Sequence, residues 1–232
     1  MISVLLLTRL GINLLGSSIL FIINVLIYKR TPGASKTYYF WAFATTFLFL
    51  GALYSLVASF FFDVDNIEHE GASGLLAVVY LSLYLVGYYH LALGALVLPA
   101  DLKITNYNIE KIIHTRKYVF IGILIWSSFV SLLLALIDSK IPIRIFYQPF
   151  IVICWLCTFY AVIPLYNTLK NYAPYWKFLL LGTLCGFVGS TLKILGYLFF
   201  EPLFYIEAIL YVGLAMFVIL GFYKLGKDLE AL

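Results

Sequence analysis

Residues 74–99 read GLLAVVYLSLYLVGYYHLALGALVLP, a stretch without Asp, Glu, Lys or Arg. The hydrocarbon core of a bilayer is about 30 Å thick, and a helix crosses it with roughly 20 apolar residues. The stretch is long enough and apolar enough to meet this requirement. It therefore predicts one transmembrane helix.

Six further runs of similar length and character surround this stretch, at residues 3–28, 38–62, 118–137, 145–169, 176–200 and 203–223. With 64% hydrophobic and 11% charged residues, the chain is too apolar for a soluble domain of this size. The gaps between the runs are too short to hold a folded domain. We expect an all-α integral membrane protein with a single domain, residues 1–232, made of seven transmembrane helices.

The basic residues lie in alternate gaps between these runs. Gaps one, three and five with the residues that flank them, and the C-terminal tail, hold eleven of them, namely Lys29, Arg30, Lys36, Lys103, Lys111, Arg116, Lys117, Lys170, Lys177, Lys224 and Lys227. The other three gaps hold only Lys140 and Arg144. The positive-inside rule then predicts an N-terminus outside and a C-terminus in the cytoplasm. We expect a multi-pass protein of the cell membrane whose net charge of +4 attracts anionic lipid, with no nucleic-acid partner.

Small residues recur every fourth position in two of the runs. One stripe is Gly182, Gly186 and Ser190, and the other is Gly51, Ser55 and Ser59. Small residues at this spacing let helices approach closely, because packing drives helix association in lipid. We interpret both stripes as packing faces within the bundle, and a dimer interface is the alternative.

Three charged residues fall inside the predicted membrane segments, namely Arg9, Lys193 and Glu207. A charge at this depth is costly unless it is paired or hydrated, so it marks a candidate functional site. From a rise of about 1.5 Å per residue, all three lie roughly 6–10 Å beneath the outer surface. In a sequential bundle the first and sixth helices flank the seventh, so we expect one cluster.

Neighbouring polar residues extend this predicted cluster, namely Asn13, Tyr84, Gln148 and Tyr197. Two cations against one carboxylate leave the cluster positive. We therefore expect it to bind a small anionic or lipidic ligand in the outer half of the bundle. The alternative is structural, with Glu207 bridging Arg9 and Lys193 only to hold the helices together.

The cysteines and histidines do not predict a cofactor. Cys154 and Cys157 have a C-x-x-C spacing but fall in mid-membrane, where a thiolate is disfavoured, so we interpret them as small hydrophobic residues. No histidine lies near them in sequence, and we expect no metal site. His90 is the one histidine inside a run, whereas a membrane-embedded haem usually takes two. We expect no haem, and a haem ligand shared with another subunit is the alternative.

In length, helix count and orientation the chain resembles the microbial rhodopsins. Those proteins attach retinal to a lysine in the middle of the seventh helix. Residues 203–223 offer Glu207 and no lysine, while Lys193 belongs to the sixth run and lies off-centre. The resemblance is limited to topology, so we expect no retinal.

Three functional classes fit these observations. The first is a non-catalytic receptor or sensor that binds its ligand at the charged cluster and couples to a membrane or cytoplasmic partner protein. The second is an accessory subunit of a larger membrane complex, for example a respiratory one. The third is a small transporter or ion-conducting bundle. Its only support is the pair of helix-breaking residues Pro149 and Pro164. An enzyme is not expected, because no acid–base pair or activated nucleophile can be assembled.

Overall fold

The computed structural model of the protein describes residues 4–30, 36–61, 75–101, 109–137, 144–169, 176–198 and 203–230. Each of these ranges is one α-helix. The helices are α1 (Val4–Arg30), α2 (Lys36–Phe61), α3 (Leu75–Asp101), α4 (Ile109–Ile137), α5 (Arg144–Leu169), α6 (Trp176–Leu198) and α7 (Leu203–Glu230). The expected all-helical fold is confirmed for this part of the chain.

The sequences favour long helices because they are rich in Leu and Ala, and because proline occurs inside only two of the described helices, α3 and α5. The shortest has 23 residues and the longest 29, and at a rise of about 1.5 Å per residue each exceeds 30 Å. In the described part of the chain five helices are long and apolar enough to cross a membrane, over Lys36–Ala58, Leu76–Ala100, His114–Leu133, Phe146–Thr168 and Trp176–Gly196. The described residues of α1 and α7 form shorter apolar stretches, Leu14–Leu26 and Ile209–Gly221.

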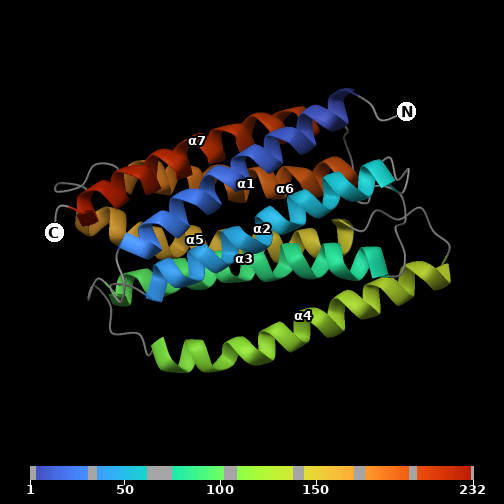
Figure 1. Cartoon of the computed structure of the whole chain (residues 1–232), viewed down its shortest axis with the longest axis horizontal. Helices are drawn as coiled ribbons and strands as arrows, with labels where there is room; N and C mark the ends of the chain where they lie inside the picture. The colour runs from blue at the N-terminus through green and yellow to red at the C-terminus, as the bar shows by residue number, and fades with distance from the viewer. Residues whose placement is uncertain are drawn as a thin grey trace.

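Six of the seven described helices form a ring. Going round it, α1 packs on α2, α2 on α3, α3 on α5, α5 on α6, α6 on α7, and α7 on α1. The expectation that the first and sixth helices both flank the seventh is confirmed. The fourth helix, α4, lies outside the ring and packs mainly against α3, as Figure 1 shows at one edge of the bundle.

Aromatic side chains fill much of the interior. One group of buried residues lies between α2, α3, α4 and α5 and includes Tyr80, Tyr147 and Trp155. A second group lies nearer the end where α2 and α6 begin, and includes Trp41 and Trp176. The indole nitrogen of Trp41 donates to the backbone oxygen of Leu91 at 3.2 Å, which fixes α2 against α3.

Helix α5 contains Pro149 and Pro164 but runs without a break from Arg144 to Leu169. Pro149 is the sixth residue of the helix, so its missing N–H removes one hydrogen bond, the one to the carbonyl oxygen of Ile145 in the first turn. The expected discontinuity that favoured transport is therefore not found in this helix.

Candidate functional site

Lys193 is a buried cation in the second half of α6. Its side chain is 9% exposed, and its Nζ lies 5.6 Å from the ring centroid of Tyr211 on α7. A cation over an aromatic face is attracted by the ring quadrupole, and the attraction strengthens where water is excluded. The structure thus places one of the three predicted charges against α7.

Ser190 lies one turn before Lys193 and joins three helices. Its hydroxyl lies 2.9 Å from the hydroxyl of Tyr211, and either group can donate. Its backbone oxygen accepts from Nε2 of Gln148 on α5 at 3.3 Å. We call Gln148, Ser190, Lys193 and Tyr211 the Ser190 network. It brings together two predicted binding residues, Lys193 and Gln148, and one residue predicted for packing.

Gln148 contributes a buried acceptor to this network. The residue is 1% exposed, and its Oε1 has no hydrogen-bond partner among the described residues. The orientation of the amide follows from the bond to Ser190, because a carbonyl oxygen can only accept and must face the NH₂ group. Most buried polar atoms in proteins are satisfied, so Oε1 is a candidate to receive a donor from a ligand.

Tyr84 belongs to a neighbouring aromatic group. Its ring centroid lies 4.7 Å from that of Tyr80, and the Tyr80 hydroxyl lies 3.1 Å from the Tyr147 hydroxyl on α5. Tyr147 directly precedes Gln148. Tyr84 also packs over Gly51 of α2, where an added Cβ would lie 3.0 Å from its ring. Tyr84, which we expected among the ligand-binding residues, therefore lies beside the Ser190 network and is linked to it through Tyr80 and Tyr147.

Four predicted site residues have side chains outside the described residues, namely Arg9, Asn13, Tyr197 and Glu207. Their convergence on Lys193 stays a prediction. The helices that carry the three charges are neighbours in the ring, because α7 packs against both α6 and α1. Glu207 also precedes Tyr211 by four positions on α7, a spacing that puts both on one helix face.

The two predicted packing stripes make room for aromatic rings. A Cβ at Gly186 would lie 2.6 Å from the Trp155 ring, just as Gly51 makes room for Tyr84. The other described members, Gly182, Ser190 and Ser55, are buried, and the side chain of Ser59 lies outside the described residues. The glycines thus accommodate large neighbours, a role that the spacing pattern alone does not reveal.

Tyr211 was missed by the sequence analysis. A tyrosine in an apolar run of this aromatic chain carries no signal by itself. Its spacing of four from Glu207 acquires meaning only with the structure, which places Tyr211 against Ser190 and Lys193.

The Ser190 network offers a cation, an amide and two hydroxyls. Cys154, Cys157 and Cys185 are free thiols, and the first is buried. Within the described ranges no three His, Cys, Asp or Glu side chains gather as metal ligands.

Comparisons with known proteins give no relative from which a role can be transferred. No protein-family model, curated protein or solved structure matches the chain. Its function has to be argued from its own residues.

Proposed function

We propose that this protein is a receptor-like, non-catalytic membrane protein that binds a small hydroxylated anion at the Ser190 network. All seven helices span the membrane in this proposal, with the N-terminus outside and the C-terminus in the cytoplasm. Eleven basic residues against two in alternate gaps support that orientation. The Ser190 network then lies in the outer half of the bundle.

The observation that carries the proposal is the unpartnered Oε1 of Gln148. An acceptor buried to this extent destabilises the fold by about 1–3 kcal/mol unless a donor reaches it. A ligand hydroxyl supplies such a donor. An unsatisfied acceptor in a well-packed region is expected at a ligand-binding site, because functional sites often keep features that lower the stability of the free protein.

Charge gives the second requirement on the ligand. Lys193 is buried on α6, and Glu207 and Arg9 belong to the next two helices in the ring order, α7 and α1. Two cations and one carboxylate leave one positive charge in excess, which favours an anion. The hydroxyls of Ser190 and Tyr211 can each donate or accept, so each can bond to the anionic group or to the hydroxyl of the ligand.

The proposal is tested with three probes of nearly equal size. Lactate carries both a carboxylate and a hydroxyl, propionate lacks the hydroxyl, and propane-1,2-diol lacks the charge. We expect lactate to raise the Tm of the purified protein most, propionate less, and the diol not at all. Lys193→Met should remove the effect of lactate, whereas Lys177→Met, an exposed lysine on the same helix, should keep it. Equal shifts for all three probes, or an unchanged lactate shift in Lys193→Met, would contradict the proposal.

A second candidate function rests on α4. This helix lies outside the ring and exposes large apolar side chains along its length, including Tyr118, Ile125, Trp126, Phe129 and Leu136. Such a face suits an accessory subunit that docks in a larger membrane complex, and lipid alone is the other occupant. Purification from native membranes in mild detergent separates the two. A stoichiometric membrane partner supports the accessory role, and a lone chain supports the receptor-like role.

A further inference from the structure

His90 on α3 has a buried ring nitrogen with no hydrogen-bond partner in the described part of the chain. The residue is 0% exposed, and its Nδ1 lies 2.8 Å from the backbone oxygen of Val86. A carbonyl oxygen only accepts, so Nδ1 carries the proton of the neutral imidazole and Nε2 is left as an acceptor. Nε2 is buried and has no hydrogen-bond partner among the described residues. This atom is therefore suited to receive a hydroxyl donor.

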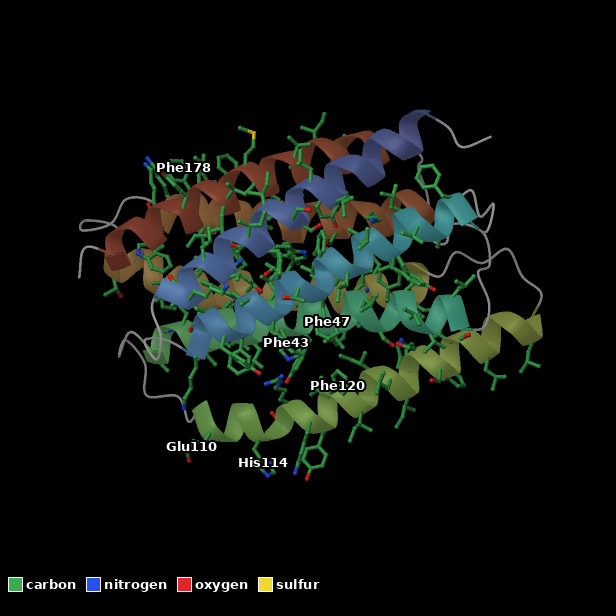
Figure 2. All side chains as sticks on the ribbon, in the orientation of Figure 1. Phe43, Phe47, Glu110, His114, Phe120 and Phe178 are labelled. Carbon is green, nitrogen blue, oxygen red and sulfur yellow. The ribbon has the colours of Figure 1, made fainter. Side chains whose placement is uncertain are left out.

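Arg116 on α4 is held by aromatic rings. Its Cζ lies 5.6 Å from the ring centroids of Tyr39 and Phe40, and 5.0 Å from that of Phe43. The faces of these rings attract the positive charge of Arg116. They do not accept hydrogen bonds from its N–H groups, which point outward in the plane of the guanidinium. Glu110, the one acidic residue whose side chain is described, points from α4 away from the other helices, as Figure 2 shows. Within the described structure, the N–H groups of Arg116 can thus serve an oxygen acceptor of a ligand.

Phe43 connects these two polar groups. Its ring centroid lies 4.6 Å from that of His90, so His90 and Arg116 both contact the same ring. Tyr89 contacts the imidazole from the α3 side, with ring centroids 5.2 Å apart. An acceptor and a set of donors therefore share one aromatic enclosure built from α2, α3 and α4.

The residues of this enclosure differ in how far they are covered. Tyr39 is 41% exposed, and Phe43 and Arg116 are half-buried, whereas His90 is fully covered. The apolar span of α4 begins at His114, two residues before Arg116. Arg116 therefore lies close to one end of the apolar layer, and His90 lies deeper. A ligand that enters here from the membrane needs an apolar tail and a flat polar head.

These features select one ligand chemistry. A phenolic hydroxyl can donate to Nε2 of His90, a second ring oxygen can accept from Arg116, and the ring can stack on Phe43. We propose that His90 and Arg116 form a binding site for a membrane-soluble phenol of the quinol class. The oxidised quinone fits less well, because its two oxygens accept only and leave Nε2 without a donor.

This site is independent of the proposed function. His90 lies fifteen residues after the start of α3, whereas Gln148 lies four residues after the start of α5 at the same end of the bundle. The two sites thus differ in depth and share no residue. Either proposal can fail while the other stands.

The test uses the purified full chain in detergent and three probes with the same tail. These are decylubiquinol kept reduced without oxygen, decylubiquinone, and the dimethyl ether of the quinol, which has no donor. The amount of each probe retained on the immobilised protein gives its affinity. We expect the wild-type chain to bind the quinol roughly tenfold more tightly than the ether or the quinone, the effect of one hydrogen bond to a buried acceptor. Equal retention of the three probes by the wild-type chain overturns the proposal, and this comparison needs no variant.

Three variants assign the effect to the two residues. His90→Phe should remove the preference for the quinol, and Arg116→Gln should weaken binding of all three probes. Lys117→Gln is the matched control, because it removes the same charge from an exposed neighbouring position. A preference for the quinol that survives in His90→Phe, or binding that falls equally in Arg116→Gln and Lys117→Gln, also overturns the proposal.

Discussion

The indole ring of Trp155 occupies the space beside Gly186 that any other residue would need for its side chain. A Cβ at Gly186 would lie 2.6 Å from Cδ2 of that ring, closer than real Cβ atoms come to their neighbours. Trp155 is buried on α5 and its ring lies 6.0 Å from that of Tyr88 on α3. The contact between α5 and α6 therefore depends on the absence of a side chain at one position.

Gly186→Ala should destabilise the protein, because the ring of Trp155 is buried and cannot move aside freely. Overpacking of this kind costs about 1–3 kcal/mol. Gly122→Ala on α4 is the control, since nothing lies within 4 Å of a Cβ at that position. Thermal unfolding in one detergent compares the two variants. A Tm for Gly186→Ala equal to that of the wild type would show that α5 and α6 separate easily.

The hydroxyl pair of Ser190 and Tyr211 should couple α6 to α7. Tyr211→Phe removes the hydroxyl but keeps the ring near Lys193, and we expect a loss of about 0.5–1.5 kcal/mol. Ser190→Ala should cost a similar amount, and the double variant should cost less than the two single changes together. Unfolding free energies of the four proteins measure this coupling. Simple additivity would mean that the two hydroxyls do not interact.

Gln148→Leu should separate stability from binding. The change removes the unpartnered Oε1 along with the bond to Ser190, so the free protein should keep its Tm or gain slightly. The same change should reduce the stabilisation by lactate to that given by propionate, because the ligand hydroxyl loses its acceptor. Thermal unfolding with and without lactate gives both quantities. A large loss of Tm without ligand would instead assign Gln148 a structural role.

The orientation predicts which loops react with an impermeant thiol reagent. In a chain with its three cysteines replaced, new cysteines at Asp65 and Glu70 should react in intact cells. A cysteine at Asn106 should react only after permeabilisation, because that gap is predicted to be cytoplasmic. Labelling at Asn106 in intact cells would reverse the orientation and move the Ser190 network to the inner half.

Helix positions could be predicted from the sequence because hydropathy and length determine them. The run at residues 74–99 corresponds to α3, which spans Leu75–Asp101. The place of α4 could not be predicted, since a helix outside the ring and a helix within it are equally apolar. Its fully buried Ser127 and exposed Ile125 become informative only when the neighbours are known.

The candidate site was predictable where a residue type is rare in a membrane. Lys193 stands out by its charge and Gln148 by its amide, and the structure places both in one network. Tyr211 could not be predicted, because tyrosine is common in this chain and its role depends on the hydroxyl it meets. His90 stood out as the one histidine in a run, but its neighbour Arg116 was counted only as a topology signal.

The packing of α7 against α1 has a consequence for assembly. Helix α1 gains its second neighbour in the ring only after α7 has been made. Until then the side of α1 that faces α7 lacks its partner, and the ring stays open. In a chain that ends before α7, both α1 and α6 should therefore lack a packing neighbour, although only one helix has been lost.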